Sequence, residues 1–289
     1  MADFKKMFQS FVPLKAGVIG DVMLDTYIWG KVDRISPEAP VPVVTLDQKE
    51  YRIGGAGNVA LNCHSLGAQV FILSVTGDDT DALLLEELFN ENQIDTSYMV
   101  KSGERRTTNK TRIISRNQQM MRLDSEVTHD LNPKDEKKLL EKIKFFIETE
   151  DPEVMIFEDY NKGVLTERVI HEVISLCRAA GIVTAVDPKR KNFFSYQHAD
   201  IFKPNLKEVK EALNLLVDDV NKLQLENIHK ELENMLHHQV SFITLSEKGV
   251  FYQQDEKSGI ISSHRRNIAD VSGAGDTVIA VASLVYAVT

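Results

Sequence analysis

Short apolar runs alternate with helical patterns along most of this chain. The run AGVIG at residues 16–20 has the length and composition of a buried strand. From residue 154 onward, similar runs alternate with amphipathic segments of helical length, which is typical of strands joined by crossover helices. Strands are predicted at residues 16–20 and 70–75 and within residues 154–163, 182–190, 200–209 and 240–253, and helices within residues 53–68, 79–92, 132–150 and 164–180. The pattern predicts an α/β fold with a doubly wound, mostly parallel sheet flanked by helices.

Two segments depart from this alternation. Residues 27–46 hold Pro37, Pro40 and Pro42 among β-branched residues, and proline is excluded from central strands, so this segment predicts an edge or protruding ribbon. Residues 107–124 alternate in polarity like exposed antiparallel strands. Together they predict a discontinuous β lid at about residues 27–52 and 104–124. Its apolar residues suit a cover over a substrate, a dimer contact, or both.

The second lid segment is rich in cations, namely Lys110, Arg112, Arg116 and Arg122. Guanidinium and ammonium groups at this density can bind a phosphate on a substrate. They can equally keep an edge ribbon soluble. For each single residue both interpretations stay open, and we expect at least one of the four to contact a ligand phosphate.

The C-terminal segment begins with small polar residues and continues as a strongly apolar helical pattern. Such a pattern predicts a helix buried in the middle of the protein. The small residues Gly273, Ala274 and Gly275 leave the first backbone N–H groups free to bind an anion, and Asp276 follows them directly. An anion cradle beside a carboxylate suits phosphoryl transfer, with Asp276 as the base. The alternative is a turn that needs glycine only for packing.

Other polar residues follow the predicted strands and helices. Asp21 and Asp25 come directly after the first strand, at the edge of the sheet where ligands bind in open α/β folds. They are candidates for sugar hydroxyls, although Asp25 could instead cap a turn. Gly54, Gly55 and Asn58 precede a helix and allow close approach of a ligand. A dinucleotide site is disfavoured, because its glycines would follow the first strand directly.

The segment Asn205, Leu206, Lys207 and Glu208 opens another predicted helix. Asn205 and Glu208 share one face of the first turn and could hold Mg²⁺ through water. The same spacing is that of a capping box, and spacing alone favours the cap.

Composition limits the choice of partners and compartment. The 289 residues carry a net charge of −9, with 43% hydrophobic and 27% charged residues. This balance argues against general nucleic-acid binding and against an anionic membrane surface. Cys63 and Cys177 lie in apolar helical patterns, which indicates reduced thiols and a cytoplasmic protein. The N-terminal residues predict a short surface helix and no signal peptide, and no segment reaches the length of a membrane span.

The segment DVSGAGD, from Asp270 to Asp276, closely resembles the C-terminal signature of the PfkB, or ribokinase-like, family of sugar kinases. The resemblance implies that Asp276 is the catalytic base and that Gly273, Ala274 and Gly275 form the anion hole. It implies ATP as phosphate donor and a role for Asn205 and Glu208 in organising Mg²⁺, reversing the preference for a plain cap. By the same match, Thr244, Ser246 and Gly249 approach the nucleotide, and Asp21, Gly54, Gly55 and Asn58 bind sugar hydroxyls. Lys162, Arg112 and Arg122 are further candidates for the substrate.

Within that family, RISPEAPVPVV (residues 34–44) and SRNQQ (residues 115–119) most resemble kinases of D-glycero-β-D-manno-heptose 7-phosphate. The implied product is the 1,7-bisphosphate, an intermediate of ADP-heptose and lipopolysaccharide precursor synthesis. The alternatives are a kinase for another sugar, of the fructose 1-phosphate or ribose class, and a non-catalytic sugar- or nucleotide-binding homologue. A homodimer formed through the lid is expected.

Three features depart from the family pattern. Ser246 stands where many sugar kinases have glycine, and Arg190 stands where heptose kinases often have glycine, which could alter the phosphate pocket. The chain ends at Thr289 inside an apolar helical pattern, whereas the family continues through helices that complete the adenine pocket. We therefore expect a single kinase domain, residues 1–289, that lacks the C-terminal part of the family fold.

Overall fold

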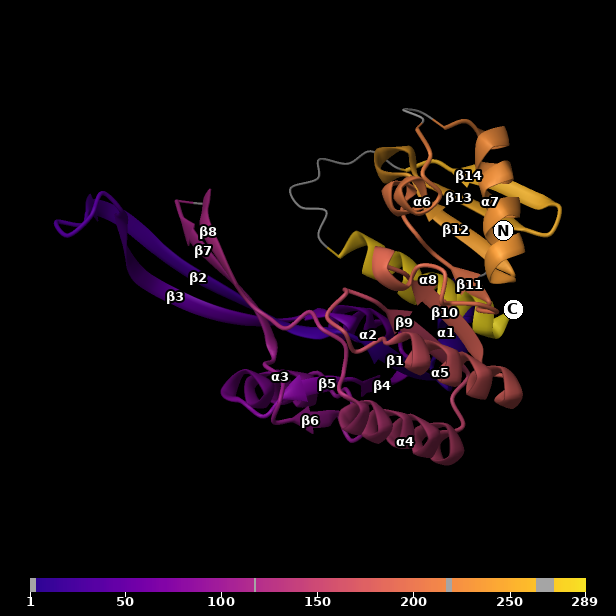
Figure 1. Ribbon diagram of the computed structural model, residues 1–289, viewed down its shortest axis with the longest axis horizontal. Coiled ribbons are helices and arrows are strands. Elements are labelled where there is room, and N and C mark those ends of the chain that lie inside the picture. The colour runs from indigo at the N-terminus through magenta and orange to yellow at the C-terminus, as the bar shows by residue number, and fades with distance from the viewer. Residues whose placement is uncertain (1–3, 117, 217–219, 264–272) are drawn as a thin grey trace.

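The computed structural model describes residues 4–116, 118–216, 220–263 and 273–289. Its centre is an eight-stranded sheet in the order β14-β13-β12-β11-β10-β9-β1-β4 (Figure 1). The strands are β1 (Lys15–Gly20), β4 (Gln69–Leu73), β9 (Val154–Glu158), β10 (Val183–Asp187), β11 (Ile201–Phe202), β12 (Val240–Thr244), β13 (Val250–Gln254) and β14 (Lys257–Ile261). All neighbours from β4 to β12 pair in parallel, and β13 and β14 form an antiparallel edge. The predicted α/β architecture is confirmed.

Helices cover both faces of this sheet, and each face has its own apolar core. Because side chains alternate along a strand, Val18 packs with the core of α1, α2 and α8, and Ile19 packs with that of α4, α5 and α7. The helices are α1 (Phe4–Phe11), α2 (Ala56–Ser65), α3 (Thr80–Glu91), α4 (Pro133–Glu150), α5 (Glu167–Ala180), α6 (Leu206–Ala212), α7 (Lys222–Leu236) and α8 (Ala274–Val288), with 3₁₀ turns η1 (Arg190–Asn192) and η2 (Ser246–Lys248). Among the helices of the described residues, none combines the length and apolar character needed to cross a bilayer.

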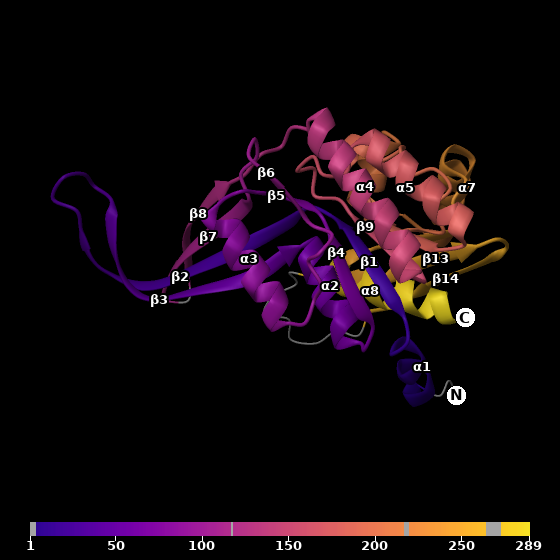
Figure 2. The ribbon, with the colours of Figure 1, turned by 90° about the horizontal axis from the view of Figure 1, so that it is seen from below.

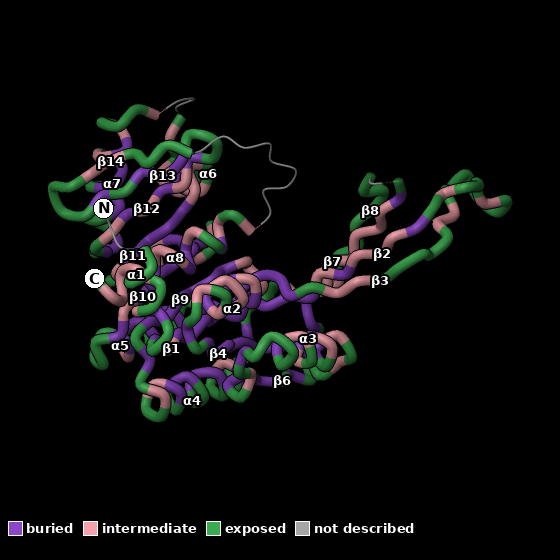
Figure 3. Tube along the Cα trace, turned by 180° about the vertical axis from the view of Figure 1, so that it is seen from behind, coloured by how far each residue is buried: buried purple, intermediate pink, exposed green. Residues whose placement is uncertain are grey.

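A four-stranded lid protrudes from one side of this body (Figure 2). Its order is β3-β2-β7-β8, formed by β2 (Val22–Ile35), β3 (Pro42–Gly55), β7 (Thr108–Ser115) and β8 (Gln118–Ser125). Pro42 begins an edge strand and Pro37 and Pro40 lie in the connection before it, as the exclusion of proline from central strands predicts. The outer part of the lid is largely exposed (Figure 3).

Two predicted elements differ from those in the structure. The strand predicted at residues 70–75 breaks at Ser74, whose hydroxyl donates to the Gly20 carbonyl at 2.6 Å. The chain then forms β5 (Val75–Gly77), which pairs with β6 (Val100–Ser102) in a separate small sheet. The helix expected from residue 164 begins at Glu167, because the Thr166 side chain accepts a hydrogen bond from the Val169 amide and caps it.

Helix α8 is buried on one face only, which corrects the expectation of a fully buried helix. Ile279 and Leu284 are completely buried, because α8 packs against α2, β9 and β10. Its other face lines an apolar groove with β12 and the antiparallel edge of the sheet. Apolar composition on all sides predicted burial, but among the described residues α8 is covered mainly on the face that packs against α2, β9 and β10.

Candidate active site

Asp276 lies in the first turn of α8 and is held by two side chains from distant elements. Its Oδ2 accepts a hydrogen bond from Asn58 Nδ2 at 2.6 Å, and its Oδ1 accepts one from the Tyr160 hydroxyl at 3.3 Å. The residue is 7% exposed, but the partners that hold its carboxylate are polar. Burial raises the pKa of Asp276, the Asn58 hydrogen bond lowers it, and neighbouring Asp187 raises it. The net pKa is raised, so the carboxylate is a stronger base than a free aspartate.

The N-terminus of α8 begins at a glycine. Gly273 is the N-cap residue, with φ at 79°, and within the described part of the chain no side chain caps the first N–H groups, which is what an anion cradle requires. A Cβ at Gly273 would stand 2.7 Å from Asn58 Nδ2, so glycine allows both the backbone turn and the hydrogen bond to Asp276. The remaining residues of the signature, Asp270, Val271 and Ser272, lie outside the described residues.

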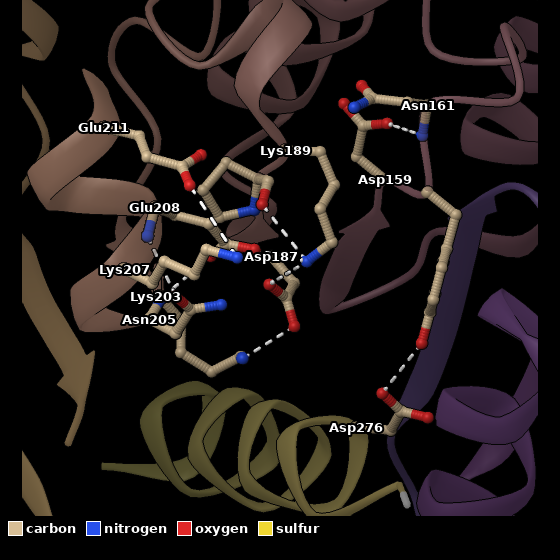
Figure 4. Close-up of polar contacts among 12 residues, drawn as sticks. Asp159, Asn161, Asp187, Lys189, Lys203, Asn205, Lys207, Glu208, Glu211 and Asp276 are labelled. Atoms are coloured by element: carbon tan, nitrogen blue, oxygen red, sulfur yellow. Dashed lines mark hydrogen bonds and ion pairs between the residues drawn. The ribbon is translucent and has the colours of Figure 1, made fainter. Parts of the chain in front are cut away.

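Charged side chains from neighbouring strand ends, including Asp187 and Lys203, lie to one side of Asp276 (Figure 4). Glu158 and Asp187 lie opposite each other at the carboxyl ends of β9 and β10, and Lys203 follows β11. The Lys203 ammonium is 2.6 Å from Asp187 Oδ2, and this ion pair is almost completely buried. Sequence analysis did not assign Glu158, Tyr160 or Lys203 to the site, although their positions at strand ends were a usable signal.

This cluster fits a divalent cation. Glu158, Asp187 and Asp276 each offer a carboxylate oxygen, and the three oxygens lie within 4.8 Å of one another. Within the described part of the chain, Glu158 Oε2 is buried without a hydrogen-bond partner, as an oxygen left for a cation would be. Hard oxygen ligands of this kind suit Mg²⁺.

The segment from Asn205 to Glu208 forms the capping box that spacing alone favoured. Asn205 Oδ1 accepts from the Glu208 amide at 2.9 Å, and Glu208 Oε2 accepts from the Asn205 amide at 2.8 Å. The other oxygen, Glu208 Oε1, is 2.7 Å from Lys189 Nζ. Because both carboxylate oxygens are engaged, these residues suit Mg²⁺ only through water. Leu206 packs against the core, and Lys207 is exposed and pairs with Glu211, away from Asp276.

The residues predicted to approach a nucleotide lie beside this helix. Thr244 ends β12 and forms a parallel bridge with Asn205. Ser246 has φ at 54°, which explains why glycine suits this position, and Gly249 at φ 103° has the Ile261 carbonyl where a Cβ would stand. The structure thus brings both predicted nucleotide segments together. Arg190 is exposed and begins η1.

The residues predicted to contact the sugar have different surroundings in the structure. Asp21 is 1% exposed, and its oxygens accept from the amides of Tyr160, Lys162 and Val164 at 2.9, 3.0 and 3.1 Å. These hydrogen bonds show that Asp21 also holds the loop that carries Tyr160, and its predicted contact with a sugar hydroxyl stays a prediction. Gly54 and Gly55 lie where β3 meets the start of β2, and a Cβ at Gly54 would stand 2.4 Å from Asp25 Oδ2. Asn58 reaches Asp276, and Asp25 lies beside Arg112.

The three cations assigned to the substrate all have carboxylate partners. Arg112 is 2.6 Å from Asp25, and Lys162 is 2.7 Å from Glu126. Arg122 is 2.8 Å from Asp124 and half exposed. Sequence spacing could not show these pairs, because most of the partners are far apart along the chain.

Changing Asn58 to alanine should move the acid limb of the pH–rate profile to higher pH. The hydrogen bond from Asn58 lowers the pKa of Asp276, so its loss raises that pKa further. Asp276 is predicted to act as the base in its unprotonated form, so activity is expected to be lost at a higher pH on acidification. The profile of kcat/KM against pH tests this, with Asn62→Ala as the matched control, since Asn62 lies one turn along α2 and bonds Thr277. An unchanged acid limb in Asn58→Ala would contradict the assignment.

Changing Gly275 to alanine should spare the fold and damage the reaction. The added methyl would stand 3.6 Å from Lys203 Nζ and 3.8 Å from Asp187 Oδ2, both ordinary contacts. Alanine also favours a helix over glycine by about 1 kcal/mol. We expect an unchanged or higher melting temperature and a kcat/KM lowered by about 10- to 100-fold if phosphate approaches this backbone closely. Equal loss of stability and activity would mean that Gly275 serves packing alone.

The sequence matches the family described as pfkB family carbohydrate kinase over residues 14–287. Proteins named bifunctional protein HldE from Aliarcobacter butzleri and Geobacter sulfurreducens are 40% and 37% identical to it, over 91% and 98% of this chain. The chain spans only 54% and 57% of the length of these relatives.

Solved structures show the same fold at lower identity. Phosphofructokinase-2 from Escherichia coli, in complex with fructose-6-phosphate, has a TM-score of 0.73 and 17% identity, over 96% of this chain and 87% of that one. Ribokinase from Arabidopsis thaliana, complexed with ribose and ATP, has a TM-score of 0.71 and 15% identity, over 95% and 86%. The family match spans nearly the whole chain and includes the Asp276 helix, so this chain belongs to the pfkB family of carbohydrate kinases.

Proposed function

We propose that this kinase phosphorylates the anomeric C1 hydroxyl of D-glycero-β-D-manno-heptose 7-phosphate, with ATP as donor. The observation that carries a kinase reaction is Asp276, oriented by Asn58 and Tyr160 at the open N-terminus of α8. The heptose substrate is supported by the resemblance of residues 34–44 and 115–119 to heptose kinases and by the relatives named HldE.

The residues of the site have separable tasks in this reaction. Asp276 takes the proton of the attacking hydroxyl, and the backbone N–H groups at the start of α8 stabilise charge on the transferred group. Lys203 holds Asp187 in place beside them. Glu158 and Asp187, with Asn205 and Glu208 through water, would hold Mg²⁺, which neutralises phosphate charge when bound.

A substrate panel tests this proposal directly. The chain is incubated with ATP, Mg²⁺ and one acceptor at a time: heptose 7-phosphate, fructose 1-phosphate or ribose. Phosphorus NMR of the product should show a new phosphate on C1 of the heptose and a kcat/KM at least about tenfold higher than for the other acceptors. A higher kcat/KM for another sugar would overturn the heptose assignment, and tight sugar binding without turnover would favour a non-catalytic homologue.

We also propose a homodimer formed through the lid, in the cytoplasm. The lid exposes large apolar side chains, including Ile35, Leu46 and Leu123, which a partner surface would cover. Two buried free cysteines suit a reducing compartment. Light scattering of the chain and of a Leu123→Asp variant measures the first claim, and an unchanged monomer mass for both would contradict it.

A further inference from the structure

Seven charged side chains gather where the lid meets the body, and their charges do not balance. Four are cations and three are carboxylates. Three ion pairs join them: Arg112 with Asp25, Arg122 with Asp124, and Lys162 with Glu126. The fourth cation, Lys110, has no ion pair or hydrogen bond among the described residues.

The register of the lid explains why Lys110 is left over. On β7, Lys110 lies directly opposite Asp25 of β2 and Asp124 of β8. Both carboxylates turn away: Asp25 reaches Arg112, two residues along β7, and Asp124 is held by Arg122 on its own strand. Lys110 and Arg112 lie on one face of the strand, because side chains alternate.

The surroundings of Lys110 make this unpaired charge costly. Its side chain is partly buried, and its ammonium lies 5.7 Å from the centre of the Tyr160 ring. Burial lowers the pKa of Lys110 and the nearby Lys162 ammonium lowers it further, and these effects outweigh the carboxylates of Asp25, Glu126 and Asp124, which raise it. A desolvated cation beside a second cation is stabilised when an anion binds to it.

Tyr160 connects this charge to the reacting centre. The Tyr160 hydroxyl donates a hydrogen bond to Asp276, and the Lys110 ammonium of the lid lies over the Tyr160 ring. An acceptor sugar must place its reacting hydroxyl at Asp276, and its remaining atoms can extend past Tyr160 toward the lid. In the proposed reaction the transferred phosphate would bind at the N-terminus of α8, where the first backbone N–H groups lie.

We infer that the Lys110 ammonium is the anchor for a phosphate already present on the acceptor sugar, and that it selects phosphorylated over unphosphorylated sugars. The inference rests on the proposed function and deepens it. It replaces Arg112 and Arg122 as the principal phosphate contacts, because carboxylates already neutralise both. A phosphate dianion at Lys110 also offsets the excess positive charge of the cluster.

Calorimetric binding without nucleotide tests this inference separately from turnover. Lys110→Met keeps most of the length of the side chain and removes the charge that lies near Tyr160. We expect it to weaken binding of heptose 7-phosphate by about 10- to 100-fold, since hydrogen bonds to charged groups are typically that strong. Binding of the unphosphorylated heptose should stay unchanged. Lys110→Arg should retain the preference for the phosphorylated sugar, and the exposed lid variant Arg116→Gln should behave as wild type.

The outcomes separate this inference from the proposed function. Equal preference for the phosphorylated sugar in wild type and Lys110→Met would overturn the role of Lys110, whether or not the protein is a kinase. If sugar phosphates bind in a way that depends on Lys110 but no phosphate is transferred, the kinase function would be overturned. The role of Lys110 as phosphate anchor would then still hold. Since the ammonium is unpaired, Lys110→Met should melt at the wild-type temperature or above it, so the variant remains measurable.

Discussion

Replacing Asp276 with asparagine is expected to lower kcat by about 10²- to 10⁴-fold, the usual contribution of acid–base catalysis. Asparagine keeps the size of the side chain and can still bond Asn58 and Tyr160, but it cannot take a proton from the sugar hydroxyl. Steady-state rates with saturating ATP and acceptor measure the effect. Sugar binding should change much less than kcat, because the loss falls on the transition state.

Stability measurements complete this test. The pKa of Asp276 is raised by burial, so its neutral form is favoured in the folded state. The folded state therefore gains stability from this group at low pH, and loses it as pH rises through the raised pKa. Asparagine carries no such cost, so Asp276→Asn should be at least as stable as wild type at neutral pH. Wild-type turnover by this variant would rule out Asp276 as the base.

Replacing Lys203 with methionine is expected to lower the free energy of unfolding by about 3–5 kcal/mol, as for other broken buried ion pairs. The change leaves Asp187 almost fully buried and without the ammonium 2.6 Å away. Lys189, at 3.6 Å from Asp187 Oδ1, partly compensates, so the lower end of this range is expected. Urea unfolding with an unchanged m-value measures the loss.

A double variant separates the charge from the packing. Lys203→Met with Asp187→Asn removes both charges, and it should recover most of the stability lost in the single variant. It should remain impaired in catalysis, because Asp187 lies in one carboxylate cluster with Glu158 and Asp276, the predicted base. A single variant as stable as wild type would show that Lys203 contributes nothing to the fold.

Most helices and strands of the fold could be predicted from the local pattern of apolar and polar residues. The apolar run at residues 16–20 and the regular alternation after residue 154 predicted the parallel sheet, because strand and helix periods differ in sequence. The prolines predicted the edge strand of the lid, because proline is excluded from central strands. Ser74 was missed as a strand break, because its partner is the Gly20 carbonyl, 54 residues away.

The site was predictable in outline and not in detail. The glycines before Asp276 indicated an open helix start, since small residues act there through the local backbone. Asp21 was assigned to the sugar, and the sequence did not show that its carboxylate also accepts hydrogen bonds from three amides of the loop after β9. Asn58 was also assigned to the sugar, and it reaches Asp276 across 218 residues. The sequence shows that a polar side chain needs a hydrogen-bond partner, but which partner it contacts depends on the segments that pack beside it.

The sequence by itself determined the layers of this protein, the protruding lid and the position of Asp276 in the first turn of a helix that begins at a glycine. These depend on periodicity, backbone conformation and residue size, which act over a few neighbouring positions. Only the tertiary structure determined which charged side chains pair. Arg112, Arg122 and Lys162 each form an ion pair with a carboxylate, and Lys110 forms none with the residues that the structure describes. Electrostatic pairing depends on distances of a few ångströms between strands, and these distances arise only when the strands have taken their register.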